Sequence, residues 1–444
     1  METEMKMNRE LFDFISQSPT AWHTAASAAK RLEEAGYTEL FEAEKWTLQP
    51  GRGYFVRRNG SSLIAFRLPE GGARGFMIMA GHGDSPCFKL KEGPEVKTAG
   101  AYRQLNVERY GGMLLSTWLD RPLSLAGRVV IRKNGRLISR LINIDRDLLL
   151  IPNLAIHMDR GANEGKRLDP NTDMLPLAGM LEGREIRALA AEAAGEAEEN
   201  IAARDLFVYS RAPGAVWGGD GEFISAPRLD DLQCVFACLQ GFLSARETES
   251  IPVFCVFDNE EVGSGTKQGA DSGFLADTLH RAWEGAGMPE RDCRRALAES
   301  FMVSADNAHS VHPNHPELAD RNDRPVMNGG VVIKHNANQK YTTDAVSAAV
   351  FREICRRAGV PVQSYSNRAD IAGGSTLGNI SSAHVSIDTV DVGLAQLAMH
   401  SAYETAGARD TAYLARAAEA FYSSSLRRSA EGIEILSARE KEEK

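Results

Sequence analysis

Two adjacent glutamates, Glu260 and Glu261, follow an apolar run at 253–257. The run is rich in β-branched and aromatic residues and lies between Pro252 and Gly263, a pattern typical of a buried strand. Neighbouring residues at a strand end point to different sides, so the two carboxylates can serve different purposes. In a two-metal hydrolase one carboxylate ligates a cation and another takes the proton of the attacking water. The residues alone leave open which glutamate does which, and a charged loop is the alternative.

Polar side chains also follow two other apolar runs. His82 and Asp84 come after the run at 76–81, and Asp306 comes after the run at 301–305. A histidine that ligates a metal usually donates its second ring N–H to a carboxylate or carbonyl. We therefore expect Asp84 to orient His82 or to contact the metal site itself. Asp306 repeats the pattern of a carboxylate at a strand end.

Two further segments complete the candidate site. Asp230 and Asp231 precede an apolar stretch with helical spacing, where acidic residues commonly cap free N–H groups. We expect Asp231 to cap or support, and Asp230 to bridge two cations. His400 lies in a segment, 394–425, that the pattern predicts to be one helix. Its assignment as a ligand depends on the other candidate residues.

The candidate ligands are imidazole and carboxylate groups without a thiolate. Such a set suits zinc, with cobalt or manganese as alternatives, and does not suit a structural zinc site built from cysteines. Five ligands can serve two cations about 3.5–4 Å apart if one aspartate bridges them. The sequence therefore predicts a two-metal hydrolytic centre.

Six motifs, in this order along almost the whole chain, resemble those of the aspartyl aminopeptidase family of dinuclear zinc exopeptidases. They lie at 81–87, 228–232, 258–264, 304–309, 373–376 and 397–401. The resemblance implies a metallo-aminopeptidase that removes one N-terminal residue from peptide substrates, preferring Asp or Glu. An aminopeptidase of neutral or broad specificity, a related dinuclear deacylase or carboxypeptidase, and a metal-bound scaffold are alternatives. Glu260 argues against a scaffold, because a scaffold needs no base.

The resemblance also implies the role of each site residue. It implies two zinc ions per subunit with five ligands: His82 and Asp306 on one zinc, Glu261 and His400 on the other, and Asp230 between them. Glu260 would be the general base, and Asp84 would orient His82. The family often has Thr where Gly83 stands and His where Asn259 stands. These departures remove no ligand but affect loops around the site.

Candidates for substrate binding are weaker. Lys334 follows an apolar run and would pair with an acidic side chain of the substrate; an exposed lysine at a strand end is the alternative. His157 resembles a family histidine that reaches a neighbouring subunit's site. Tyr341 is a further candidate. Gly374 and Ser375 lie in a glycine-rich segment that would present backbone N–H groups to substrate, or form a simple turn.

Composition limits the class of protein. The chain has 444 residues, 43% hydrophobic and 25% charged, with a net charge of −9, as expected for a globular protein of about two domains. The negative charge gives no support for binding nucleic acid or an anionic membrane surface. Six cysteines without a Cys-x-x-Cys pair favour a reduced compartment. Without a signal-like start or a membrane-spanning run, we expect a cytoplasmic protein.

The order of patterns predicts an α/β fold with an insertion. Strands and helices alternate after 230, with the candidate ligands at strand carboxyl ends, where open α/β sheets place their sites. Since the strand before His82 belongs to the same sheet, the region between is inserted. We expect residues 1–92 and 226–444 to form the catalytic domain, a mixed central sheet flanked by helices as in zinc exopeptidases. We expect 93–225 to form a β-rich domain.

Several local expectations accompany this division. Strands are predicted at 114–119, 127–132 and 136–141, with a hairpin at Asn134-Gly135. One amphipathic helix is predicted from 8 to about 36, and the tail at 439–444 has no apolar anchor. The resemblance implies that the inserted domain mediates dimerisation and that the protein is a homo-oligomer, commonly a dodecamer.

Overall fold

The computed structural model describes residues 2–438; Met1 and the expected unanchored tail at 439–444 lie outside the described residues. The largest sheet has nine strands in the order β1-β2-β3-β13-β4-β14-β18-β16-β17. Their bounds are Thr38–Leu40, Gly53–Arg58, Ser62–Arg67, Ser250–Phe257, Gly75–His82, Phe301–Ala305, Asp388–Gly393, Val331–His335 and Val362–Ser366. The central strands β13, β4, β14 and β18 run parallel, whereas β3 and β16 pair antiparallel with this group.

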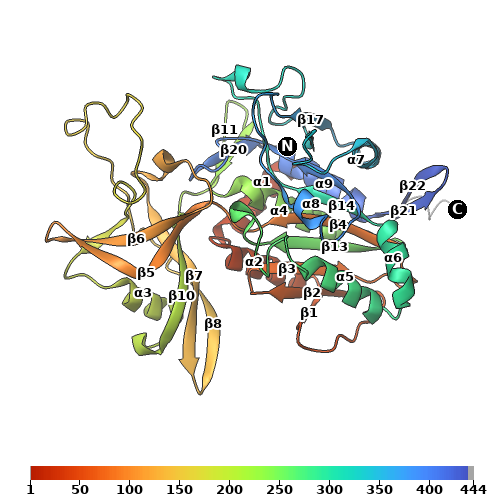
Figure 1. Cartoon of the computed structure of the whole chain (residues 1–444), viewed down its shortest axis with the longest axis horizontal. Coiled ribbons are helices and arrows are strands. Elements are labelled where there is room, and N and C mark those ends of the chain that lie inside the picture. Colours follow the sequence, from red (N-terminus) through yellow and green to blue (C-terminus); the bar gives the residue numbers. More distant parts are fainter. Residues whose placement is uncertain (1, 439–444) are drawn as a thin grey trace.

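Helices cover both faces of this sheet (Figure 1). One apolar core contains buried residues of α1, α2, α4, α7 and α9, which span Glu2–Ser16, Ala21–Glu34, Leu229–Ser244, Ala345–Arg357 and Asp410–Tyr422. A second core lies on the opposite face, with α5 (Phe274–Gly285), α6 (Glu290–Ala298) and α8 (Leu377–Ser381). Every residue of β4 and β13 is buried between these two cores, as expected for parallel strands with helices on both faces. The predicted α/β class, a mixed sheet flanked by helices, is confirmed.

The region between β4 and α4 forms a separate six-stranded antiparallel sheet in the order β8-β7-β10-β5-β6-β9. The strands span Arg136–Asn143, Leu123–Lys133, Ile201–Ser210, Cys87–Thr98, Tyr102–Tyr110 and Leu177–Met180, and α3 (Ile186–Ala194) packs nearby. This sheet has its own apolar core and lies beside the large sheet (Figure 1). The hairpin expected at Asn134-Gly135 joins β7 to β8. The division at 92/93 and 225/226 stays a prediction.

A third sheet lies where the two regions meet. Its five strands, in the order β11-β12-β20-β19-β15, span Ala215–Trp217, Phe223–Ala226, Glu404–Gly407, Ala395–Leu397 and Ala308–His309. The prediction of one helix over 394–425 was therefore wrong in its first half, because α9 begins only at Asp410. The alanines and leucines there have helical propensity, but pairing of β19 and β20 with neighbouring strands outweighs it. A two-stranded ribbon, β21 (Ser424–Ser429) and β22 (Gly432–Ser437), follows α9.

Two other local predictions were wrong. The helix expected from 8 to about 36 is two helices, α1 and α2, separated by a short link that contains Pro19. Proline interrupts a helix because it lacks the N–H donor and clashes with the preceding turn. The strand expected at 114–119 is a 3-10 helix, η1 (Leu115–Trp118).

In the part of the chain that the structure describes, no helix combines the length and the apolar character needed to cross a bilayer.

Candidate metal centre

The centre lies at one edge of the large sheet, where three parallel strands end. His82 is the last residue of β4, Asp306 directly follows β14, and the segment after β13 leads to Glu260 and Glu261. The register pairs Phe257 with His82 and Ser304 with Ala80, so these ends reach the edge together. Parallel strands expose their carboxyl ends on one side, and open α/β sheets build their sites there.

The first turn of α4 packs against the end of β4. Asp231 accepts a hydrogen bond from the backbone N–H of His82 at 3.1 Å. A methyl group at Gly81 would lie 2.7 Å from Asp231 Oδ2 and 3.3 Å from the Ala305 carbonyl oxygen, distances too short for van der Waals contact. Glycine at 81 therefore allows α4 to approach the strand ends. Asp230 and Asp231 are joined by a cis peptide bond.

Asp230 lies between the two histidines. Its Oδ1 is 3.6 Å from His82 Nε2, and its Oδ2 is 3.4 Å from His400 Nε2. Two groups of potential ligand atoms therefore meet at this aspartate: His82, Asp230 and Asp306 form one, and Asp230, Glu261 and His400 form the other. Within each group the ligand atoms all lie within 4.8 Å of one another.

The two glutamates face different surroundings. They lie on a 3-10 turn, η3 (Glu260–Val262), which begins three residues beyond the end of β13. Their side chains therefore point in different directions because of this turn, and not because of the alternation along a strand that the sequence predicted. Glu261 Oε2 is 3.3 Å from His400 Nε2, and the Glu261 side chain is 3% exposed. Glu260 Oε2 is 4.0 Å from His82 Nε2, and its side chain is 14% exposed. A third potential ligand group combines His82 with both glutamates. Asp306, at 3.9 Å from His82 Nε2 and with a side chain that is 13% exposed, is as distant and as exposed as Glu260.

Asp84 contacts both glutamates and His82. Its carboxylate accepts hydrogen bonds from the backbone N–H groups of Glu260 and Glu261, at 3.2 and 3.1 Å. His82 Nδ1 lies 3.1 Å from the Asp84 carbonyl oxygen and 3.5 Å from its Oδ1. Acceptors at Nδ1 place the proton there and leave Nε2 free to ligate a metal.

Glu404 links two candidate ligands from distant segments. One oxygen accepts from the backbone N–H of Asp230 at 2.9 Å, and the other accepts from the N–H of His400 at 2.7 Å. His400 itself lies in the loop between β19 and β20 with a φ of 66°. The carboxylate of Glu404 thus fixes the backbone at both ligands.

Burial and neighbouring charges shift the pKa values of the side chains at the centre. Burial lowers the pKa of His82, but the carboxylates of Asp230, Asp306 and Asp84 raise it well above its ordinary value. Burial raises the pKa of Asp230, yet the nearby imidazoles of His400 and His82 hold it below its ordinary value. Burial raises the pKa of Glu261 well above normal and the pKa of Glu260 to about 7. Crowded buried carboxylates of this kind are stabilised by cations.

The residues fit a metal. Asp230 Oδ1 and Glu261 Oε1 are buried, and no hydrogen-bond partner contacts them within residues 2–438. Buried carboxylate oxygens are normally satisfied, so unpaired ones inside a cluster of imidazoles and carboxylates indicate a cation site. Nitrogen and oxygen ligands of this kind suit zinc.

The candidate substrate residues lie in different places. Lys334, at the end of β16, is only 3% exposed, with Nζ 3.5 Å from Asp306 Oδ2 and 5.5 Å from the centre of the Tyr341 ring. Gly374 and Ser375 are exposed in the loop before α8, and Gly374 lines a cavity together with His309. His157 is exposed on a turn between β8 and β9 and belongs to none of the candidate metal groups found among the described residues.

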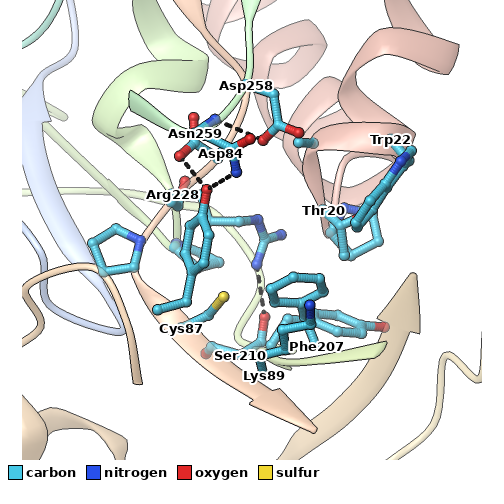
Figure 2. A pocket seen from close by; sticks show the side chains of 18 of the residues that line it. Thr20, Trp22, Asp84, Cys87, Lys89, Phe207, Ser210, Arg228, Asp258 and Asn259 are labelled. Atoms are coloured by element: carbon cyan, nitrogen blue, oxygen red, sulfur yellow. Dashed lines mark hydrogen bonds between the residues drawn. The ribbon is translucent and has the colours of Figure 1, made fainter. Parts of the chain in front are cut away.

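A cavity of about 210 Å³ lies behind the centre, between the start of α2, the inserted sheet and Asp84. Figure 2 shows Asp84 and Asn259 at its upper wall and Arg228 projecting into it, with Phe207 of β10 opposite. The Arg228 guanidinium donates to the carbonyl oxygens of Ser210 and Ile15, at 3.3 and 3.1 Å. The bond to Ile15 joins segments that are far apart in the chain.

Sequence reasoning missed two residues that contact the centre. Glu404 was included in the predicted helix, where an acidic residue four positions after His400 is unremarkable. Tyr110 ends β6 in the inserted sheet, and its hydroxyl donates to Asp84 Oδ2 at 2.7 Å. No spacing in the sequence connects it to the other motifs, since only the packing of the two sheets brings it there.

Comparison with known proteins adds independent information. The family model described as "Aminopeptidase I zinc metalloprotease (M18)" matches residues 14–422. A "Probable M18 family aminopeptidase 2" of Clostridium acetobutylicum is 46% identical over 431 residues, covering 95% of this chain and 100% of that protein. A protein of the same description from Pseudomonas aeruginosa is 43% identical over 430 residues, covering 95% of this chain and 99% of the relative.

Solved structures agree with these sequence matches. The chain superposes on a structure titled "Cryo-EM structure of the Ape4 and Nbr1 complex" with a TM-score of 0.91 and 35% identity, covering 95% of this chain and 86% of that one. It also matches a structure titled "Structure of S. cerevesiae mApe1 dodecamer" with a TM-score of 0.84 and 27% identity, covering 95% of this chain and 97% of that one.

Proposed function

The chain belongs to the aminopeptidase I zinc metalloprotease (M18) family, and we propose that it is a two-zinc aminopeptidase that prefers acidic N-terminal residues, with Glu260 as general base. The predicted family and the predicted enzyme class, a metallo-aminopeptidase, are confirmed. Family membership alone does not determine the number of metal ions, the general base or the substrate specificity. For these, the geometry of this chain supplies the support.

The observation that carries the two-metal proposal is the position of Asp230. Each of its oxygens faces a different histidine, at 3.6 and 3.4 Å, and it belongs to two ligand groups at once. An aspartate placed in this way suits a bridge between two cations. The proposed ligands are His82 and Asp306 for one zinc, Glu261 and His400 for the other, and Asp230 for both.

The chain would supply the proton transfers. Zinc ions, when bound, lower the pKa of a water molecule and polarise a substrate carbonyl. Glu260, which is more exposed than Glu261, would take the proton of the attacking water and return it to the leaving amine. Asp84 would hold the Glu260–Glu261 turn and the His82 ring in place through the contacts described above.

Lys334 supports a preference for acidic substrates. It is buried beside Asp306 and Tyr341, and Asp306 would share its charge with a zinc ion. The ammonium group would then be able to form an ion pair with an aspartate or glutamate side chain of the substrate. Gly374 and Ser375 would line the same side of the site, presenting backbone N–H groups.

Assembly and location are parts of the same proposal. By analogy with the mApe1 dodecamer, we propose a homo-dodecamer in which the inserted domain, residues 93–225, mediates dimerisation and His157 reaches a neighbouring subunit's site. The six cysteines are all free, which suits a reduced compartment, and we place the protein in the cytoplasm.

The test is hydrolysis of aminoacyl reporter substrates with Asp, Glu, Leu or Arg as the acyl residue. The purified protein would be stripped with a chelator and reloaded with zinc, cobalt or manganese. We expect chelator-sensitive activity, restored by metal and highest for Asp and Glu. Greater activity on Leu or Arg would overturn the acidic preference, and inactivity with every metal and substrate would overturn the proposed function.

A further inference from the structure

Tyr110, from the inserted sheet, makes a directed hydrogen bond to Asp84. The Tyr110 hydroxyl lies 2.7 Å from Asp84 Oδ2, and Asn259 Nδ2 donates to the same hydroxyl at 2.9 Å. The orientation of the Asn259 amide is fixed, because its oxygen accepts from Thr266 and Gln268 at 2.9 and 2.8 Å. A hydroxyl has one proton, so Tyr110, accepting from Asn259, must give that proton to Asp84.

The Tyr110 hydroxyl and ring are both held in place. Burial, together with the charges of Asp84 and Asp258, raises the pKa of Tyr110 above its ordinary value, so the hydroxyl stays protonated and remains a donor. The ring packs edge-on against Phe207 of β10, with 5.6 Å between ring centres. The position of the donor is therefore fixed by the inserted sheet.

Asp84 transmits this position to the centre. Its Oδ2 accepts from both Tyr110 and the Glu261 N–H, while its Oδ1 accepts from the Glu260 N–H and faces His82 Nδ1. The carboxylate thus has its rotation set by donors on both oxygens. Removing the Tyr110 donor would leave each oxygen with only one backbone N–H donor, so the carboxylate would be held less firmly against the glutamates and the histidine.

The residues that follow Tyr110 in the chain lie beside Glu261 and His400, the proposed ligands of the second zinc ion. A side chain at Gly111 would come within 3.1 Å of Glu261 Cβ. A side chain at Gly112 would lie 4.0 Å from His400 Nδ1, and the Leu114 N–H donates to the His400 carbonyl oxygen at 3.1 Å. The segment 110–114 therefore lies against the centre throughout its length.

We propose that Tyr110 is a positioning residue for the aminopeptidase reaction: its hydroxyl fixes the Asp84 carboxylate, and through it the His82 imidazole and the Glu260–Glu261 turn. The inserted sheet thus supports catalysis in its own subunit, separately from any part in assembly. The kinetic consequence rests on the proposed function, whereas the consequence for zinc binding does not.

The first experiment is Tyr110→Phe in the full-length protein. Loss of a residue that orients metal ligands costs about 10–100-fold in activity or metal affinity. We expect a fall of that size in kcat with KM changed by less than about twofold, and zinc lost more readily to a competing chelator. Tyr209→Phe is the matched control, because Tyr209 lines the same cavity from the same sheet but donates to Asn143 Oδ1 at 2.7 Å.

A double-mutant cycle separates positioning from general stability. If Tyr110 acts through Asp84, Tyr110→Phe adds no further loss of kcat or of zinc affinity in an Asp84→Asn background. A tyrosine that only stabilised the fold would give additive losses and would lower the midpoint of chemical denaturation in proportion.

Two results would overturn the proposal: kcat and zinc retention of Tyr110→Phe equal to those of Tyr209→Phe, or additive effects in the cycle. If the wild-type protein hydrolyses no aminoacyl substrate, the proposed function fails, but the zinc competition still decides the role of Tyr110. Weaker zinc retention in Tyr110→Phe alone would support it, and unchanged retention would refute it.

Discussion

Two neighbouring glutamates show how the surroundings of a side chain, more than its type, distinguish the residues of this centre. Glu260 and Glu261 are adjacent and chemically identical, yet their side chains are 14% and 3% exposed. The buried glutamate lies 3.3 Å from His400 Nε2, whereas the more exposed one lies 4.0 Å from His82 Nε2. In the proposed mechanism, this difference in access, and not in chemistry, makes Glu261 a metal ligand and Glu260 the group that takes the proton.

The pair Glu260→Gln and Glu261→Gln tests this assignment. Glu260→Gln removes the base and should lower kcat by about 10²–10⁴-fold while zinc content and assembly stay unchanged. Glu261→Gln removes a ligand and should lower zinc content as well. Kinetics with an Asp substrate and elemental analysis of zinc measure both effects. Full activity in Glu260→Gln would mean that another group takes the proton.

Lys334→Met tests the acidic preference. A hydrogen bond to a charged group contributes about 1.5–3 kcal/mol, which is about 10- to 150-fold in kcat/KM. We expect the ratio of kcat/KM for Asp over Leu substrates to fall by that factor. The ratio is the readout because Lys334 also contacts Asp306, so both substrates share any effect on the metal. Exposed Lys45 provides the control, Lys45→Met, for which an altered ratio would discredit the assay.

The sequence predicted side-chain chemistry better than side-chain surroundings. Carboxylates and histidines after apolar runs were recognisable because strand ends are marked by local pattern, and Lys334 was found for the same reason. Its burial was not predictable, since a strand-end lysine is usually exposed and only Asp306 and Tyr341 show why this one is not. Tyr110 and Glu404 depend on contacts between segments far apart in the chain, which local pattern does not encode.

At the scale of elements, the end of β4 and the start of α4 must meet closely for the centre to form. Gly81 is the residue that permits this, because Asp231 and Ala305 occupy the space that a side chain would need. The approach brings Asp231 to the backbone N–H of His82. A glycine in a fully buried strand is thus explained by packing and not by a turn.

Gly81→Ala should therefore lower the free energy of unfolding by about 1–3 kcal/mol, the usual cost of overpacking a core, and reduce zinc retention. Chemical denaturation and chelator competition measure the two effects. Gly71→Ala is the control, since no atom lies within 4 Å of a methyl group there. Equal behaviour of the two variants would show that α4 shifts without affecting His82.

The loop that carries His400 shows why element boundaries are harder to predict than element types. Helical propensity is a local property, and the residues from 394 onward have it. The chain there forms β19 and β20 because strands from 223–226 and 308–309 pair with them, and Glu404 binds the His400 N–H. The central α/β pattern after 230 was predictable because its apolar runs are long and regular.

At the scale of the molecule, the proposed dodecamer makes a subunit depend on its neighbour. His157 is exposed and belongs to none of the metal groups identified within residues 2–438, and the proposed role for it is exerted on another subunit's site. Exposed apolar residues near it, Leu154 (51%), Ile156 (49%) and Met158 (77%), suit burial in an assembly.

Mixed oligomers test this dependence. His157→Ala and Glu260→Gln homo-oligomers should each be inactive or nearly so. Co-expressed, they should regain activity, because a subunit with intact Glu260 can receive His157 from a partner. Kinetics and analytical ultracentrifugation of the three samples measure activity and size. Activity no higher than that of the separate variants, in oligomers of the proposed size, would show that His157 serves no neighbouring site.

The bridge that Glu404 makes between Asp230 and His400 has a consequence for synthesis of the protein. The proposed ligands extend from His82 to His400, and the carboxylate that fixes the backbone at two of them comes later still in the chain. Domains fold as their residues leave the ribosome, but this centre cannot close until Glu404 has emerged from the exit tunnel. A nascent chain therefore carries no finished peptidase, and hydrolysis begins only once translation of the subunit is nearly complete.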